Sequence, residues 1–259
     1  MNRRTVLTIA LIAVASPAHA QINLAWNNCL GHPNAAVNIQ YACDASRNGN
    51  PFRLVASFFS PTNLNAFVGI QMKFHLEQDF PHVDGPSIYP PLTDWWRLGL
   101  GECRDGNLAF PASLSGIGTG TTGTCRNPWA GANTGGGYLY HHPEYSVDGY
   151  VELLTAFARD TEIPLVQGQQ YISGVINLDT YGDVASEGIA VCSGCCEKRA
   201  IVLDQIELYQ TAGQIPPQQD IYVLNTPATR QYVMWQDQWD LCVTPTRRTT
   251  WGAIKTTYR

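Results

Sequence analysis

The stretch 67–77, FVGIQMKFHLE, decides the fold class more clearly than any other part of the sequence. Apolar and polar residues alternate along it: one set comprises Val68, Ile70, Met72, Phe74 and Leu76, and the other comprises Gln71, Lys73, His75 and Glu77. A period of two is that of a β-strand with one buried face, because successive side chains point to opposite faces. We therefore predict a half-buried strand whose apolar set faces the core.

Six further stretches carry short strand patterns: 54–59, 150–158, 171–178, 200–209, 221–224 and 232–235. The inward set of 150–158 comprises Val151, Leu153 and Phe157. In 200–209 the apolar set shifts by one position at Asp204-Gln205, which predicts a β-bulge. The turn residues of 225–230, NTPATR, predict that the last two strands form a hairpin.

Three stretches rich in Gly and Pro, 80–93, 111–137 and 211–220, are predicted to be loops between the strands. Long helical periodicity is missing from the body of the chain, and a charged fraction of 14% fits strands and loops better than helices. These patterns predict an all-β fold, a two-sheet antiparallel sandwich of jelly-roll or immunoglobulin-like type.

The two ends of the chain differ from its body. Residues 1–20 read as a Sec-type signal peptide, with Arg3 and Arg4, an apolar run over 6–15, and a small-x-small site that predicts cleavage after Ala20. A twin-arginine route and a membrane anchor are the alternatives, although the apolar run is shorter than the roughly 18 residues that a spanning helix needs. We predict a β-sandwich domain over 21–246, and secretion to the periplasm, cell surface or medium without a transmembrane segment.

Residues 247–259 form a basic C-terminal tail that contains Arg247, Arg248, Lys255 and Arg259. Trp251, Ile254 and Tyr258 fall at i, i+3 and i+7, which predicts a short C-terminal helix docked on the sandwich. A basic amphipathic segment that meets an anionic envelope surface, or a disordered tail, is the alternative. The whole chain has 16 basic and 21 acidic residues, a net charge of −5 that excludes a basic nucleic-acid binder.

The chain contains eight cysteines: Cys29, Cys43, Cys103, Cys125, Cys192, Cys195, Cys196 and Cys242. An even number in an exported chain predicts a disulfide framework. Proximity in the sequence favours the pairs Cys29–Cys43 and Cys103–Cys125, and it leaves Cys195 and Cys196 to bond Cys192 and Cys242. A zinc site and a redox-active pair are alternatives for the C-x-x-C cluster, but a second zinc knuckle is missing.

Several segments resemble a family of exported, cysteine-containing bacterial proteins of unassigned function. These segments are the run 94–99 (DWWRLG) with Cys103-Arg104, the run 192–195 (CSGC) with 201–203 and 206–208, the run 225–227 with Arg230, Tyr232, Val233 and 235–236, and the terminus 250–255 with Tyr258-Arg259. The matches are spread from about position 22 to 259. The resemblance implies secretion and a β-rich fold, and it implies no activity.

Polar clusters are weak candidates for chemistry. His75, Glu77, Asp79, His82 and Asp84, the run 141–144 (HHPE), and Asp179 with Asp183 would each suit a divalent cation, but a solvated strand face and turns are the simpler interpretations. We predict no metal site and no cofactor. Gly-x-Ser-x-Gly and Ser-x-x-Lys motifs are missing, and we name no catalytic residue. Asp94 and Glu102, which lie near two tryptophans, leave a secreted glycan-directed hydrolase as the alternative function.

Aromatic residues are the more substantial feature, with seven Trp and twelve Tyr. Those in or beside the loop-rich stretches include Trp95, Trp96, Trp129 and Tyr138, which we take as candidate ligand-binding residues. An exposed ring stacks on a sugar face or anchors a protein partner, although packing under the loops is the simpler interpretation. The sequence therefore predicts a non-catalytic extracellular binding or surface-structure module, whose partner is a polysaccharide or an envelope or surface protein.

Overall fold

The structure is a computed structural model, and it describes residues 22–43, 50–77, 92–110, 114, 117–118, 125–141, 151–180, 192–214, 219–224 and 231–237. These residues form the strands β1 (Ile22–Trp26), β2 (Asn38–Ile39), β3 (Phe52–Phe59), β4 (Leu64–Glu77), β5 (Leu108–Ala109), β6 (Thr134–His141), β7 (Val151–Leu165), β8 (Gln170–Leu178), β9 (Arg199–Gln210), β10 (Ile221–Leu224) and β11 (Gln231–Trp235), and the 3-10 turn η1 (Asp94–Trp96). The predicted signal peptide, C-terminal helix and basic tail lie outside the described residues.

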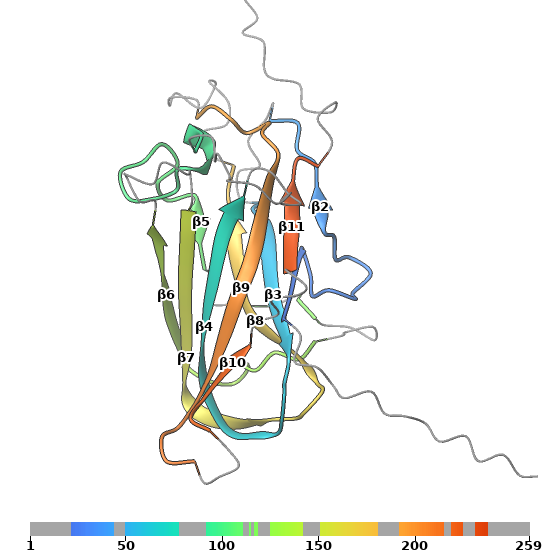
Figure 1. The fold of residues 1–259 in the computed structure, drawn as a ribbon, viewed down its shortest axis with the longest axis vertical. Helices are drawn as coiled ribbons and strands as arrows, with labels where there is room; N and C mark the ends of the chain where they lie inside the picture. Colours follow the sequence, from blue (N-terminus) through green and yellow to red (C-terminus); the bar gives the residue numbers. More distant parts are fainter. Residues whose placement is uncertain are drawn as a thin grey trace, which may run out of the picture.

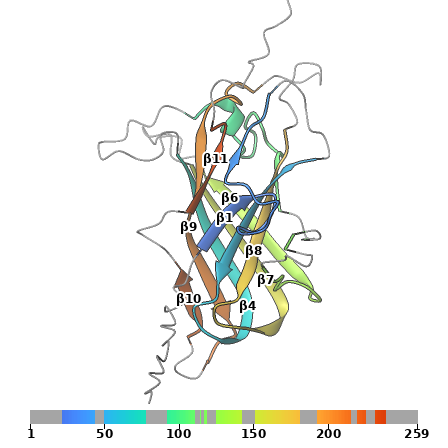
Figure 2. The same ribbon diagram turned by 90° about the vertical axis from the view of Figure 1, so that its right-hand side faces the viewer.

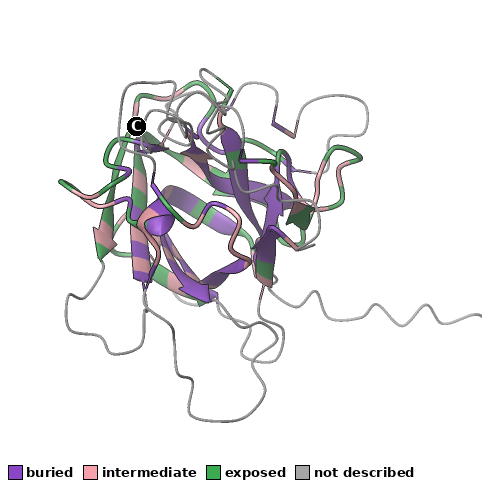
Figure 3. Cartoon of the chain, turned by 90° about the horizontal axis from the view of Figure 1, so that it is seen from above, coloured by how far each residue is buried: buried purple, intermediate pink, exposed green. Residues whose placement is uncertain are grey.

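The strands form two sheets that pack face to face, as the sequence predicts (Figure 1). The small sheet has the order β1-β3-β8-β5, and the large sheet has the order β2-β11-β9-β4-β7-β6, with β10 paired to β9. Figure 2 shows the layers from the side, with β9 and β11 across from β1 and β8. Figure 3, seen from above, shows buried residues on the facing sides of the two layers. Every described strand pair is antiparallel except β2 with β11.

Strand β4 lies in the middle of the large sheet, between β7 and β9. The predicted inward residues Ile70, Met72, Phe74 and Leu76 are buried in the core. Val68 is not, because the register shifts between Phe67 and Gly69. This irregularity turns Phe67 into the core and leaves Val68 half-buried on the outer face, which corrects the predicted inward set.

The predicted bulge in β9 is confirmed. Lys73 of β4 lies opposite Gln205, whereas the next residue, Phe74, lies opposite Leu203, so Asp204 is the extra residue. Because of the extra residue, odd-numbered residues of β9 face inward before the bulge and even-numbered residues face inward after it. Ile201, Leu203, Ile206 and Leu208 are all buried as a consequence.

The two last strands exist, but the predicted hairpin between them is wrong. Both β10 and β11 run antiparallel to β9, so they run parallel to each other. β10 pairs with 206–209 and β11 with 199–203, on either side of the bulge. The 12 residues of β9 give an edge long enough for both strands, and pairing with it replaces the local hairpin.

A strand also forms where the sequence predicts a loop, since the glycines at 135–137 belong to β6. Glycine disfavours strands because it has no side chain to pack and loses the most backbone entropy. Here the lack of a side chain leaves space for a neighbouring ring. A Cβ on Gly136 would lie 2.6 Å from Cδ1 of Phe157, and one on Gly174 would lie 2.9 Å from Cε2 of the same ring. The glycines make room for Phe157 between the sheets.

Disulfides join distant parts of the chain, and the predicted local pairs are wrong. The described bonds are Cys29–Cys125, Cys43–Cys195 and Cys103–Cys192. Sequence proximity failed as a guide because strands that are neighbours in this fold are far apart in the sequence. Cys196 is also disulfide-bonded, with a partner outside the described residues, and Cys242 lies outside them as well. Disulfides in this number are typical of oxidising compartments such as the periplasm or the exterior.

Candidate functional site

A cluster of aromatic rings fills the end of the sandwich where η1 lies, and Trp235 of β11 is its centre. The rings around Trp235 are Trp26, Tyr41, Phe52, Trp95 and Trp96, with centroids 4.5–6.2 Å from it. Trp95 stacks on Trp235 at 4.5 Å, and the indole N–H of Trp235 donates to the Cys195 carbonyl oxygen at 2.7 Å. The cluster belongs to the hydrophobic core.

Trp95 and Trp96 are therefore core residues in this structure, with exposed fractions of 0% and 1%. In a strand these neighbours would point to opposite faces, but they lie in a 3-10 turn, which brings both rings inward at 4.6 Å from each other. Neither ring presents a face to solvent. Of the four aromatic candidates, the structure brings Trp95 and Trp96 together and places Trp129 and Tyr138 elsewhere.

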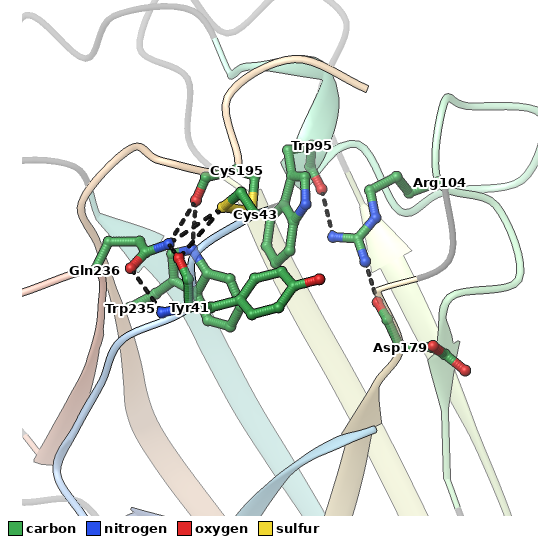
Figure 4. The surroundings of a disulfide bond; sticks show 8 residues. All are labelled: Tyr41, Cys43, Trp95, Arg104, Asp179, Cys195, Trp235 and Gln236. Atoms are coloured by element: carbon green, nitrogen blue, oxygen red, sulfur yellow. Dashed lines mark hydrogen bonds between the residues drawn. A yellow bond between two sulfur atoms is a disulfide. The ribbon is translucent and has the colours of Figure 1, made fainter. Parts of the chain in front are cut away.

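Arg104 closes one side of this cluster (Figure 4). Its guanidinium lies 3.7 Å from the centroid of Trp95 and donates to the carbonyl oxygens of Trp95, at 3.1 Å, and of Asp179. The side chain is 1% exposed. A buried guanidinium that stacks on an indole and donates to two carbonyl oxygens stabilises the fold, because these contacts compensate for its removal from water.

Gln236 fixes the bond Cys43–Cys195 on the opposite side (Figure 4). Its Nε2 donates to the carbonyl oxygen of Tyr41 at 2.5 Å and lies 3.3 Å from Cys43 Sγ and from the Cys195 oxygen, while its Oε1 accepts from the Tyr41 N–H at 3.0 Å. Cys43 and Gln236 both adopt positive φ, 58° and 57°, a strained conformation for residues other than glycine. The disulfide and the amide clamp hold this conformation in place.

The other two candidates belong to a second row of rings that leads from the surface inward. Tyr138 lies 4.9 Å from Phe110, Phe110 lies 5.7 Å from Phe157, and Phe157 lies 6.1 Å from Trp129. We call Tyr138, Phe110, Phe157 and Trp129 the aromatic row. Tyr138 is 43% exposed and Trp129 is buried, with its indole N–H donating to Ser173 O at 3.2 Å.

A cleft of about 260 Å³ opens along the aromatic row, between the β6 edge of the large sheet and the small sheet. Its lining comprises Phe110, Leu114, Trp129, Thr134, Gly135, Gly136, Phe157 and Gly174. None of these residues carries a charge, so the aromatic cleft presents ring faces, one hydroxyl group and strand backbone. Binding clefts in proteins are lined mainly in this way, by apolar and aromatic groups with a few polar ones.

Sequence reasoning missed Phe110 and Phe157 as cleft residues. The alternation in 150–158 placed Phe157 on an inward face, and this is correct, but it could not show that the core is open beside that ring. Gly135, Gly136 and Gly174 line this opening, together with the rings of Phe110, Trp129 and Phe157.

His75, one of the residues of the polar cluster at 75–84, lies between two carboxylates. Its Nδ1 is 2.6 Å from Asp204 Oδ2 and its Nε2 is 2.7 Å from Glu77 Oε1. Burial by itself lowers the pKa of His75, but the hydrogen bonds and charges of Asp204 and Glu77 outweigh it and raise the pKa to about 9. The imidazolium uses both ring nitrogens as donors, and so neither has a lone pair for a metal.

Nothing in the described part of the chain gathers three or more His, Cys, Asp or Glu side chains in a geometry that would hold a metal ion. Of the other residues considered for a cation, Asp79, His82, Asp84, His142, Glu144 and Asp183 lie outside the described residues.

The two carboxylates considered for hydrolysis share one partner. Arg97 lies 3.7 Å from Asp94 and 3.5 Å from Glu102, measured between nitrogen and oxygen atoms. Glu102 Oε2 also accepts the backbone N–H of Gly99 at 2.8 Å and so fixes the turn after η1. These contacts give both carboxylates a structural role at the surface.

No described helix has the length and hydropathy to cross a membrane. Comparison of the chain with protein families, curated proteins and solved structures gives no match.

Proposed function

We propose that the protein is an exported, disulfide-stapled, non-catalytic binding module that holds a neutral polysaccharide in the aromatic cleft. The observation that carries this proposal is the aromatic row, which continues from the half-exposed ring of Tyr138 to Trp129 along an uncharged cleft. Sugar rings present C–H faces that pack on aromatic rings, and the Thr134 hydroxyl group in the lining can exchange hydrogen bonds with sugar hydroxyl groups.

The chemistry of the lining favours a neutral glycan over an acidic or basic ligand, because the lining residues that the structure describes offer no ion-pair partner. A volume of about 260 Å³ lies just below the range of roughly 300–1,000 Å³ for small-molecule pockets, which suits one ring of a longer chain better than a whole cofactor. The alternative ligand is a protein that inserts an apolar side chain into the aromatic cleft, and the test below distinguishes the two.

Export supports a role outside the cell. Disulfides form in oxidising compartments, and the three described bonds agree with the signal peptide that the sequence predicts. We therefore also propose cleavage after Ala20 and a location in the periplasm, at the cell surface or in the medium. We further propose that the chain belongs to a family of exported, cysteine-containing bacterial proteins.

Substitution of Phe110 with alanine is expected to weaken glycan binding about tenfold. Phe110 is half-buried and contacts both Tyr138 and Phe157, so its loss interrupts the aromatic row at its middle. A loss of about 1.4 kcal/mol, within the range for one aromatic contact, corresponds to this factor. We would measure retention of the mature protein on cellulose, chitin and peptidoglycan, and the dissociation constant on whichever of them binds.

Leu100→Ser is the matched control, since Leu100 is 95% exposed and lies outside the aromatic cleft. It should bind like the wild type, and both variants should keep the wild-type circular dichroism spectrum. Equal retention of Phe110→Ala and wild type, or no retention on any of the three polysaccharides, would overturn the proposal. So would retention on cell envelopes that disappears after protease treatment, which identifies a protein ligand, or release of soluble sugar, which identifies a hydrolase.

A further inference from the structure

The edges of the two sheets are unequal, and β6 stands out among them. The edge strands β2 and β5 have two residues each, β10 has four, and all five residues of β1 are buried. β6 has eight residues, most of them exposed, and in the described part of the chain it pairs with β7 alone (Figure 1, left edge of the large sheet). Its other edge carries a row of backbone N–H and C=O groups.

β6 also lacks the features that keep edge strands apart. Natural edges are protected by lysine, proline or a bulge. The sequence TGGGYLYH has neither lysine nor proline, and its register with β7 runs without interruption from Thr134 opposite Arg159 to His141 opposite Glu152. Two large apolar side chains add to the exposed surface: Tyr138 is 43% and Leu139 is 58% exposed. No other described strand pairs with this edge, and an unpaired edge of this length is a template for another strand.

We propose that β6 pairs antiparallel with β6 of a second copy of this chain, so that the two large sheets join across a twofold axis. The sequence of β6 favours this occupant because its two halves are complementary. Glycines fill 135–137, whereas large side chains fill 138–140. Antiparallel pairing sets the small half of one strand against the large half of the other.

The pairing has a definite register. Residues directly opposite each other must point to the same face, so a twofold axis passes through one residue position. With the axis at Gly137, Gly136 lies opposite Tyr138 of the second copy and Gly135 opposite its Leu139. Cross-strand pairs of glycine with an aromatic residue cover the exposed backbone of the glycine.

The alternation of faces in β6 leaves room for these side chains. A Cβ on Gly136 would contact Phe157, so Gly136 points inward, whereas a Cβ on Gly135 or Gly137 would meet no atom within 4 Å. The outer face beside these glycines is a shallow trough of about 480 Å³ whose lining includes Val68, Ala156 and Ala158. Leu139 of the second copy would lie over the edge of this trough.

Dimerisation goes beyond the proposed function, and it adds a property to it. A twofold axis through β6 places one aromatic cleft on each side of the joined edge, so one dimer presents two clefts to an extended ligand. Two linked sites bind a polymer more tightly than one because the second binding event becomes intramolecular.

Sedimentation velocity of the mature protein, without ligand, tests the pairing over a concentration series up to about 100 µM, since an edge contact of this size gives a weak dimer. We expect a monomer–dimer equilibrium, which Gly137→Lys weakens at least about tenfold. The substitution adds no clash within the chain, but it sets two lysines opposite each other at the axis.

Val166→Lys is the control, since it adds the same charge at a residue that is 51% exposed, in the turn between β7 and β8. It should leave the dissociation constant unchanged. A monomer at every concentration, or a dimer that Gly137→Lys leaves as strong as in the wild type, overturns the pairing. Either result is distinct from failure of the glycan test, which is read from Phe110→Ala on immobilised polysaccharide.

Discussion

Replacement of both Cys43 and Cys195 with alanine is expected to lower the free energy of unfolding by about 5 kcal/mol, the largest effect of any change we consider. The bond joins residues 152 positions apart and is packed against the amide clamp of Gln236. Two contributions make up this loss of unfolding free energy: the bond restricts the unfolded chain, and its sulfur atoms pack against their neighbours in the folded protein.

The first contribution is nearly the same for all three described bonds. Together they connect the segments 29–43, 103–125 and 192–195 into one ring of roughly 40 residues, so removal of any bond opens the same ring. A ring of that size corresponds to about 4 kcal/mol of chain entropy in the unfolded state. The 152-residue separation of Cys43 and Cys195 therefore overstates the effective loop.

The second contribution distinguishes the bonds. Cys43 and Cys195 contact Gln236 beside the Trp235 cluster, and their loss leaves a small cavity at a strained turn. We add about 1 kcal/mol for this site. The matched variant carries alanine at Cys103 and Cys192, opens the same ring away from Gln236, and should lose about 4 kcal/mol.

Urea unfolding followed by tryptophan fluorescence measures both values, because three tryptophans, Trp26, Trp95 and Trp96, pack around Trp235. A loss of under 1 kcal/mol in either variant would contradict the ring. A larger loss for the Cys103–Cys192 variant than for the Cys43–Cys195 variant would contradict the role given to Gln236.

The sequence predicts the parts of this fold that depend on local periodicity. The alternation in 67–77 and the phase shift at Asp204 both have physical causes that act within a few residues, and both are found in the structure. The two-sheet architecture follows from many such strands. Val68 is the exception, because it is apolar and in phase with the alternation, so the register shift beside it leaves no phase change in the sequence.

What the sequence does not predict depends on contacts between distant segments. β6 contains Gly136 where the Phe157 ring, 21 positions further along the chain, occupies the space that a side chain would need. The disulfides pair cysteines 89 to 152 positions apart. The aromatic candidates also differ because of distant contacts: Trp95 and Trp96 are buried against Trp235, whereas Trp129 lines the cleft.

The second large effect that we expect is a pH dependence that His75 alone produces. Wild-type protein should lose about 3 kcal/mol of unfolding free energy between about pH 6.5 and pH 9, relative to a His75→Gln variant. His75 is 7% exposed, and it lies between Glu77, at 3%, and Asp204, at 29%. The side chain is buried deeply enough for these carboxylates to act with little screening by water.

The sign follows from the direction of the shift. The folded-state pKa of His75, about 9, lies above the value of 6.5 that the residue has in an unfolded chain. Below pH 6.5 both states are protonated, and the ion pairs contribute fully to stability. As the pH rises toward 9 the unfolded state releases its proton while the folded state keeps it, and the contribution declines to zero above the folded pKa.

A control is needed for the ion pair beside His75, because Glu152 lies opposite His75 on β7 and pairs with Lys73 at 2.5 Å. Lys73 is 39% exposed, so Lys73→Gln should cost less than about 1 kcal/mol and should leave the pH dependence intact. Urea unfolding at intervals from about pH 6 to pH 10 compares the three proteins, and NMR titration of the His75 ring gives its pKa directly. Parallel pH curves for wild type and His75→Gln, or an imidazole that titrates near 6.5, would contradict the ion pairs of His75 with Asp204 and Glu77. A pKa near 9 would instead support the ion pairs of His75, to which the bulge at Asp204 contributes one of the two carboxylates.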